Sequence, residues 1–403
     1  MEFVLSCAHR DPRCAVKEPR ANHVQEIDGL MNAGAESTAS AAGGSNGDVQ
    51  VSCRDVWKVF GPNAARAIAS GDVDLPRAEL MAKTGCTVAS RDISFDVGHG
   101  EVFVIMGLSG SGKSTLVRCV TRLIEPTSGA ISICGQDVLG ADPKELRGLR
   151  RTKVSMVFQH FGLFPHRNVI DNVAYGLEVQ GIDRVKRHER ARELLGVVGL
   201  SSVEASYPDQ LSGGMQQRVG LARALAVDPE VLIFDEAFSA LDPLIRRGMQ
   251  DEVLRLQERL RKTVIFVTHD LDEALKLGDR IAIMKDGRFV QVGTPADIVG
   301  APADDYVREF VRDVPRGEVL TAAFATQPHS GGETPVDVVR HDQRLGELLP
   351  VIFGAQGPIG VVDGGGQLVG ILDRRLVIHV LAGREGSSVP EELAFDVTPT
   401  GQP

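Results

Sequence analysis

A short glycine-rich segment, "GLSGSGKST" at residues 107–115, has the composition and spacing of a loop that holds phosphate groups. It fits the pattern G-x-x-x-x-G-K-S/T and lies between the apolar run "VFVIM" and a run with helical periodicity. Glycines let the backbone curl so that N–H groups face an anion, and the following helix adds its positive end. We predict a nucleotide site in which Lys113 reaches the β- and γ-phosphates and Ser114 binds Mg²⁺. Its residues are Gly107, Ser109, Gly110, Ser111, Gly112, Lys113, Ser114 and Thr115.

Further polar groups follow three short apolar runs that have the character of buried strands. "VLIFDE" ends in Asp235 and Glu236, "TVIFVTH" ends in His269, and Gln159 follows "SMVF". Carboxylates at the end of a buried strand are costly unless they bind something. We predict that Asp235 binds Mg²⁺ and that Gln159 bridges the metal and the attacking water. Glu236 is then the group that polarises this water, and His269 contacts the γ-phosphate.

A second glycine-rich segment, "LSGGMQQ" at residues 211–217, opens another predicted helix. Ser212, Gly213 and Gly214 offer backbone N–H groups to an anion. The loop at 107–115 already covers one side of a triphosphate, so we expect the second segment to close over the ATP of another copy. A two-fold dimer would then enclose two ATP molecules.

The arrangement of apolar residues predicts the fold class. Over residues 49–313, short and nearly all-apolar runs alternate with amphipathic runs, which indicates an α/β domain with a largely parallel sheet. Residues 1–48 are rich in Ala, Ser and Gly without periodicity, and we expect a disordered tail there, with Met1 or Met31 as the start. Residues 314–403 are expected to form a separate, smaller unit.

The overall composition excludes several classes of protein. A net charge of −10 without a long basic run argues against a nucleic-acid partner. The six cysteines show no C-x-x-C spacing, which favours a reduced compartment without a disulfide framework or a zinc site. No apolar run approaches the roughly 18 residues that span a bilayer, so any membrane crossing would belong to another chain.

Taken in order, the motifs "GLSGSGKST", Gln159, "LSGGMQQ", "VLIFDE", "SALD" (239–242) and His269 resemble those of the ATP-binding subunit of an ABC transporter. The resemblance implies a P-loop domain with a RecA-like core and a helical subdomain, at 163–225, that grips the membrane partner. It implies that Asp242 lies in a loop crossing the dimer interface. It also implies that Phe60 stacks on adenine, with Trp57 as the nearby competitor.

Three departures from the general family pattern narrow the resemblance. Met215 replaces a glutamine, Ala237 replaces a proline, and a segment at 62–88 separates the first two strands. These features resemble the ATPases of glycine betaine/proline importers. An importer of methionine or polar amino acids is the first alternative. A nucleic-acid-directed ABC ATPase is opposed by the acidic charge, and a regulatory protein that binds ATP without turnover is opposed by the intact catalytic residues.

The resemblance also implies the partners and the location. It implies an ATPase that powers osmoprotectant import as a homodimer, together with transmembrane permease subunits and an extracytoplasmic substrate-binding protein. The chain would be peripheral, on the cytoplasmic face of the inner or plasma membrane. No residue of the chain would touch the solute, so the choice among glycine betaine, proline, choline, carnitine and ectoine stays open.

The segment 358–383, "PIGVVDGGGQLVGILDRRLVIHVLAG", resembles a single cystathionine-β-synthase-type (CBS) module. We expect Asp373 to cap its closing helix, and a preceding module to be reduced to a remnant around 318–335. Asp373 and Leu376 stand where adenosine-binding modules have Ser/Thr and Asp, which argues against nucleotide binding here. Two interpretations remain open: Arg374 and Arg375 sense ionic strength at an anionic membrane surface, or the unit is a packing remnant.

Overall fold

The computed structural model describes residues 49–159, 162–239, 241–328 and 334–383. These residues all belong to one of the two units into which the chain divides, 47–403. The tail expected at 1–48, with its two possible starts, lies outside the described residues. Among the residues described, no helix is both long and apolar enough to cross a bilayer.

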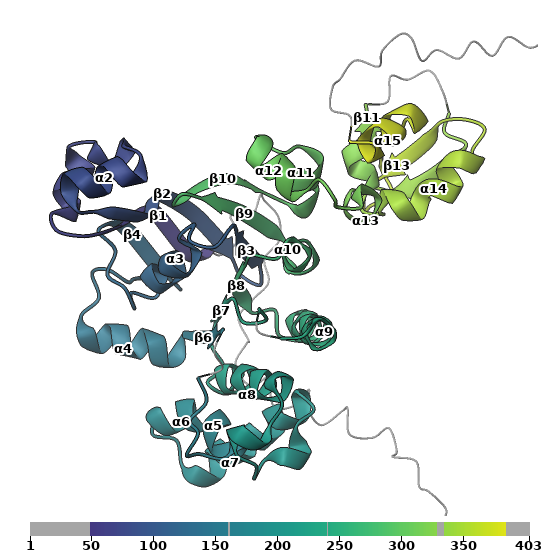
Figure 1. The fold of residues 1–403 in the computed structure, drawn as a ribbon. Coiled ribbons are helices and arrows are strands. Elements are labelled where there is room, and N and C mark those ends of the chain that lie inside the picture. Colours follow the sequence, from purple (N-terminus) through teal and green to yellow (C-terminus); the bar gives the residue numbers. More distant parts are fainter. Residues whose placement is uncertain (1–48, 160–161, 240, 329–333, 384–403) are drawn as a thin grey trace, which may run out of the picture. The chain divides into compact units, whose positions relative to one another are not determined.

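A six-stranded sheet with the order β10-β9-β3-β8-β7-β6 forms the centre of the fold (Figure 1). Five of its strands are parallel, and β10 pairs antiparallel to β9 at one edge. This confirms the predicted α/β class with a largely parallel sheet. The strands are β3 (Val102–Met106), β6 (Val154–Phe158), β7 (Val231–Asp235), β8 (Thr263–Thr268), β9 (Arg280–Lys285) and β10 (Arg288–Gly293).

The central strands are apolar throughout because both faces of the sheet are covered. Alternate side chains point to opposite faces, so Val104 and Met106 of β3 join one core while Phe103 and Ile105 join the other. Helices α8 (Gly213–Ala226), α9 (Pro243–Leu260) and α10 (Leu271–Leu277) cover the first face. Helix α3 (Lys113–Val120) and a second sheet cover the other.

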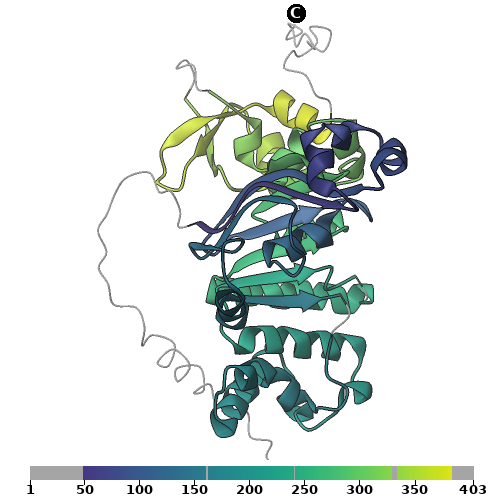
Figure 2. The ribbon, with the colours of Figure 1, turned by 90° about the vertical axis from the view of Figure 1, so that its left-hand side faces the viewer.

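The second sheet is antiparallel, with the order β2-β1-β4-β5. Its first two strands are purple to blue in Figure 2. Its strands are β1 (Val49–Phe60), β2 (Thr87–Gly98), β4 (Ser128–Ile133) and β5 (Gln136–Asp137). Val51, Cys53 and Ile93 from this sheet pack with Leu116 and Val120 of α3. Phosphate-loop helix α3 is thus held between two sheets.

A group of helices occupies the segment expected to be helical, and α8 joins it to the central sheet. Leu194, Leu195 and Val219 lie in the same apolar core as the first face of the sheet. Besides α8, the helical group contains α5 (Val169–Val173), α6 (Tyr175–Val179) and α7 (Arg184–Val197). Helix α4 (Pro143–Thr152) lies outside the group and precedes β6.

The segment at 62–88 forms α1 (Ala64–Ala69), a 3-10 turn (Asp72–Asp74) and α2 (Arg77–Thr84) around a small core of its own. Two ion pairs of Asp74 link it to the rest of the domain: one to Arg91 of β2 and one, at 3.7 Å, to Arg288 of β10. The backbone N–H of Arg91 donates to the carbonyl oxygen of Gly287 at 2.7 Å, and the N–H of Gly287 donates to Ser111 O at 3.0 Å. The segment is therefore connected to Ser111 of the glycine-rich loop through Arg91 and Gly287.

The C-terminal residues form a small mixed sheet with the order β11-β14-β13-β12. The strand–turn–strand at 359–372 and the cap of the last helix by Asp373, which accepts from the N–H groups of Arg375 and Leu376, are as expected. Its elements, preceded by α11 (Pro295–Gly300) and α12 (Asp305–Phe310), are α13 (Arg316–Val319), η4 (Ala322–Ala325), β11 (Thr326–Gln327), β12 (Asp337–Arg340), α14 (Leu345–Gly354), β13 (Ile359–Val362), β14 (Leu368–Leu372) and α15 (Arg374–Leu381).

One expectation about this unit was wrong. The start of the supposed remnant at 318–335 is part of the same unit, because β11 pairs with β14 and Ala322 and Ala325 are fully buried in the core. Arg374 is exposed, but its guanidinium donates to the carbonyl oxygens of Ile352 and Ala355 at 3.1 and 2.7 Å, and the proposed response of Arg374 and Arg375 to ionic strength stays a prediction. These bonds satisfy orphan carbonyl groups at the end of α14.

Candidate nucleotide site

The loop between β3 and α3 turns sharply between two packed strands. Gly107, Gly110 and Gly112 have φ angles of 151°, 81° and 108°, which side chains rarely adopt. A Cβ on Gly107 would overlap the carbonyl oxygen of Met284, and one on Gly112 would overlap that of Ala89. Ser109 and Gly110 are exposed at the tip, whereas Ser111 is buried. Glycine is required here both by conformation and by lack of space.

Lys113 is the first residue of α3, and its side chain is only 3% exposed. Its Nζ donates to the carbonyl oxygens of Gly107 and Leu108 at 2.8 and 3.0 Å and lies 3.6 Å from Oε1 of Glu236. Burial lowers the pKa of this ammonium group, and the charge of Glu236 opposes that shift. Ser114 and Thr115, in the first turn of α3, are half-buried. An ammonium held in this loop is poised to exchange backbone carbonyls for phosphate oxygens.

The other sequence-predicted residues follow the carboxyl ends of neighbouring parallel strands. Asp235 of β7 is paired with Phe158 of β6 and Val267 of β8, and Met106 of β3 is paired with Thr268. Gln159, Glu236, His269 and Gly107 come directly after or beside these positions. The register therefore brings four distant sequence segments to one edge of the sheet, where ligands of such sheets bind.

Asp235 has the surroundings of a cation ligand. It is 4% exposed, and its Oδ1 is buried without a hydrogen-bond partner among the described residues. Its Oδ2 lies 3.3 Å from Nη2 of Arg118. The hydroxyl oxygen of Ser111 is likewise buried without a partner in the described part of the chain. Buried polar atoms of this kind are suited to contact a bound ligand, and a carboxylate oxygen suits Mg²⁺.

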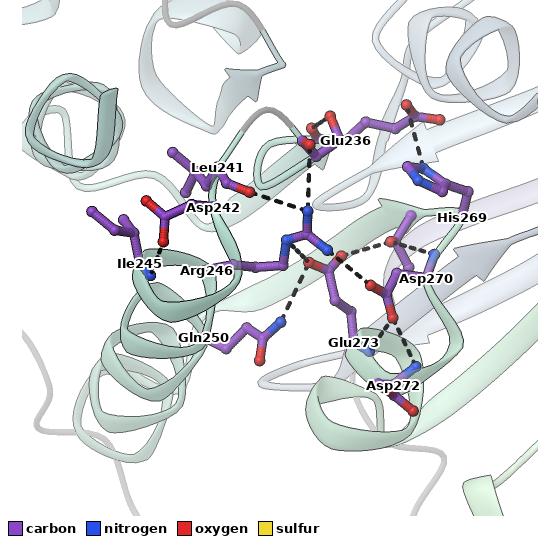
Figure 3. Close-up of polar contacts among 12 residues, drawn as sticks. Glu236, Leu241, Asp242, Ile245, Arg246, Gln250, His269, Asp270, Asp272 and Glu273 are labelled. Atoms are coloured by element: carbon purple, nitrogen blue, oxygen red, sulfur yellow. Dashed lines mark hydrogen bonds and ion pairs between the residues drawn. The ribbon is translucent and has the colours of Figure 1, made fainter. Parts of the chain in front are cut away.

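Glu236 lies between two basic groups, of which Figure 3 shows His269. Its Oε1 faces Lys113, and its Oε2 is 3.8 Å from Nδ1 of His269. The backbone has a φ of 50°, which is uncommon for a residue with a side chain, and its N–H donates to Val267 O at 3.0 Å. The Glu236 side chain is 22% exposed and that of His269 is 52% exposed, while Gln159 is also exposed. A carboxylate reachable by water and fixed in this way can accept a proton from an attacking water molecule.

The second glycine-rich segment begins α8, as expected. The Ser212 hydroxyl caps the helix by accepting from the N–H of Met215 at 3.4 Å. Ser212 and Gly213 are exposed, and Gly214 is buried where a Cβ would overlap the side chain of Ile245. Met215 packs against the apolar core. The surface formed by Ser212 and Gly213 is thus available to another molecule, and the methionine points elsewhere.

Asp242 begins another helix. Its carboxylate caps α9 by accepting from the N–H groups of Leu244 and Ile245, both at 3.1 Å, while the residue remains exposed. Its role at a dimer interface stays a prediction.

Phe60 is 43% exposed at the end of β1 and is paired with Thr87, two residues before the Ala89 that touches the loop. Trp57 instead packs against the small core of the 62–88 segment and under Arg91. The arrangement favours Phe60 over Trp57 as the aromatic beside the loop.

Sequence reasoning missed two arginines of this region, Arg118 and Arg246. Arg118 follows Ser114 by four residues, a spacing that places both side chains on the same face of α3. Arg246 follows Asp242 by four residues at the start of α9, and its guanidinium contacts two loops at once. Helical spacing was the available signal in both cases, but only the fold shows which carboxylates and carbonyls these arginines meet.

Comparison with known proteins also indicates an ATP-binding protein of the ABC transporter family. The model of the ABC transporter family matches residues 90–239. The chain is 54% identical over 68% of its length to the glycine betaine transport ATP-binding protein OpuAA of Bacillus subtilis, spanning 66% of that relative. It is 47% identical over 84% of its length to the trimethylamine N-oxide transport system ATP-binding protein TmoW of Pelagibacter ubique, spanning 99% of that relative.

The fold also matches solved structures. A dimeric structure of a bacterial ABC transporter cassette is 31% identical, with a TM-score of 0.52, and the match covers 60% of this chain and 98% of that one. A post-hydrolysis dimer bound to ADP and phosphate gives the same values. The family model and these relatives, together with the phosphate loop and the carboxylates Asp235 and Glu236, show what the chain is. It belongs to the ATP-binding proteins of ABC transporters, and it is an ATPase that binds ATP.

Proposed function

We propose that this ATPase powers the import of glycine betaine and related methylated osmolytes through a membrane permease. The observation that carries the proposal is Glu236, a water-accessible carboxylate placed between Lys113 and His269 at the end of β7. The named relatives that serve glycine betaine and proline betaine transport supply the solute class. Reconstitution with the cognate permease and binding protein tests it: ATP hydrolysis should rise with the transported osmolyte and not with methionine.

The geometry supports the following catalytic roles. Loop 107–112 and Lys113 bind the phosphates, and Phe60 packs against the base. Glu236 accepts the proton of the attacking water, and His269 and Gln159 orient the γ-phosphate and that water. Mg²⁺, held by Ser114, Gln159 and Asp235, would neutralise charge on the phosphate oxygens.

Each nucleotide would be shared between two copies of the chain. Ser212–Gly214 of one copy, with Ser212 and Gly213 exposed at the start of α8, would close over the ATP bound to loop 107–112 of its partner. The N–H groups of a helix start suit this role because they attract anions. The dimeric state of the similar solved structures supports a homodimer here, in which Asp242 lies at the interface.

Trimethylamine N-oxide is a second candidate solute beside glycine betaine. The alignment with the trimethylamine N-oxide relative spans nearly all of that protein, whereas the alignment with OpuAA spans about two thirds of it. Glycine betaine and trimethylamine N-oxide share a nitrogen that carries three methyl groups. The reconstituted transporter should therefore be assayed with both, and the solute that stimulates hydrolysis at the lower concentration is the physiological candidate.

The permease would dock in a groove beside the catalytic edge. This groove of about 300 Å³ is lined by the end of β6, by α6 and by the segment after α3. Leu123, Phe158 and Val179 expose 51%, 37% and 38% of their surface there. Phe158 directly precedes Gln159, so a helix seated in the groove would lie next to the catalytic residues.

Replacing Val179 with aspartate should weaken permease binding at least about tenfold, because it places a charge in an apolar contact. Co-purification with the permease measures this, and ATP binding by the chain alone should not change. Val185→Asp is the matched control, since Val185 is 64% exposed at the start of α7, outside the groove lining. Equal co-purification of both variants would place the permease elsewhere.

The 62–88 segment should support the phosphate loop through Asp74. Without the charge of Asp74, the guanidinium groups of Arg91 and Arg288 repel each other across Gly287, which is hydrogen-bonded to the loop. Asp74→Asn should therefore weaken ATP binding about two- to fivefold, as expected for a partly exposed ion pair. Asp72→Asn is the control because Asp72 pairs with Lys83 inside the segment, at 2.6 Å. Titration of a fluorescent ATP analogue measures both, and equal affinities would contradict the link.

A further inference from the structure

A polar network joins the two loops that flank the catalytic carboxylate (Figure 3). At its centre is Arg246, in the first turns of α9. Its Nη1 donates to Oδ2 of Asp270 at 3.1 Å, and its Nη2 donates to the carbonyl oxygens of Leu241 and Ser239 at 3.1 and 3.5 Å. One guanidinium thus bridges the segment after Glu236 and the segment after β8.

Below this guanidinium lies a buried carboxylate. Glu273 of α10 is 3% exposed, and its Oε1 lies 3.8 Å from Nε of Arg246. It accepts from the Thr268 hydroxyl at 2.6 Å and from the Gln250 amide at 3.3 Å. Burial raises the pKa of Glu273. The carboxylate fixes Thr268, the last residue of β8, and through Arg246 the start of α9.

The two bridged loops carry the reactive groups. The N–H and hydroxyl of Ser239 both bond to the Glu236 carbonyl oxygen, at 3.2 and 2.9 Å. His269 lies between Thr268 and Asp270, and the N–H of Asp270 donates to the Thr268 hydroxyl at 3.0 Å. Any shift of Arg246 therefore acts on the backbone on both sides of the gap between Glu236 and His269.

We propose that Arg246 is a positioning residue for ATP hydrolysis: by tying Ser239 and Leu241 to Asp270, it sets the spacing of Glu236 and His269. This role needs a planar group with several N–H donors that can bond to backbone carbonyls and to a carboxylate at the same time. The guanidinium of arginine has these donors in a fixed plane, and the ammonium of lysine does not. The inference rests on the proposed roles of Glu236 and His269 and adds the group that holds them in register.

The test compares Arg246→Met with Arg247→Met in the purified full-length protein. Arg247 is the next residue of α9, is exposed, and carries the same charge. Arg246→Met should lower kcat about 10- to 100-fold, as small misplacements of catalytic groups do. The KM for ATP should stay within about twofold, because loop 107–112 and Lys113 are untouched, and Arg247→Met should match the native protein.

Two further variants separate positioning from stability. Arg246→Lys keeps the charge and loses the fork, so its kcat should remain low. Arg246→Met/Glu273→Gln removes the unpaired buried charge, so its thermal unfolding should recover while its kcat does not.

The proposal is overturned if Arg246→Met keeps the native kcat, or if the double variant regains it. Failure of the proposed function has a different signature: in that case the native protein itself does not hydrolyse ATP, or Glu236→Gln hydrolyses it at the native rate.

Discussion

Replacing Glu236 with glutamine should stop ATP hydrolysis and leave ATP bound. Glutamine has nearly the same size, so the site stays filled, but its amide cannot accept the proton of the attacking water. Loss of a general base lowers kcat about 10²- to 10⁴-fold. In the variant, Lys113 no longer has the negative charge of Glu236 at 3.6 Å, so its attraction to the phosphates is not weakened by a competing carboxylate. ATP affinity should therefore be unchanged or higher.

The dimeric state provides a second readout for Glu236→Gln. Because hydrolysis is what separates the two copies in the proposed cycle, the variant should accumulate as a dimer when ATP is added. Light scattering after size exclusion measures this, and single-turnover hydrolysis measures the chemical step. Asp272→Asn is the control: Asp272 is exposed on the neighbouring helix α10 and appears in the same region (Figure 3). Normal turnover by Glu236→Gln would remove Glu236 from the role of base.

Replacing Ser212 with arginine should abolish ATP-driven dimerisation without weakening ATP binding to the same chain. Ser212 is exposed at the start of α8, where the proposal places the partner's phosphates. A long side chain there would fill the space needed by the γ-phosphate. In the Glu236→Gln background the ATP-bound protein should then remain a monomer, and its affinity for a fluorescent ATP analogue should match that of the parent.

Loss of a helix cap alone has to be separated from this effect. The Ser212 hydroxyl caps α8, and losing a cap costs about 1 kcal/mol. Asp183 caps α7 in the same helical group, by accepting from the N–H of Val185 at 2.9 Å, so Asp183→Ala imposes a similar cost. Asp183→Ala should still dimerise with ATP. If Ser212→Arg dimerises equally well, the second glycine-rich segment does not close over a partner's nucleotide.

The sequence predicted the parts of the site that depend on local chemistry. Loop 107–115 was predictable because only glycine tolerates its backbone angles and close packing, and because a lysine and a hydroxyl at fixed offsets serve phosphate and Mg²⁺. Asp235 and Glu236 were predictable because charges at the end of an apolar strand need a ligand. The alternation of apolar runs predicted the α/β class, which the sheet confirms.

Other features depend on which segments meet, and no local pattern contains that information. The prediction of a separate remnant at 318–335 was wrong, because β11 pairs with β14, which lies more than forty residues further along the chain. Arg374 looked like a free cation at a helix start, but the end of α14 presents carbonyl oxygens to it.

The sequence by itself therefore determined the phosphate loop, the strand-end carboxylates, the helix start at Ser212 and the fold class, since each follows from spacing along the chain. Only the tertiary structure decided that Arg246 bridges the loops after β7 and β8, that Arg118 meets Asp235, and that Asp74 connects the 62–88 segment to Gly287. The physical reason is that hydrogen bonds and ion pairs act over a few ångströms in space. The register of the parallel strands, and not sequence distance, sets which groups come that close.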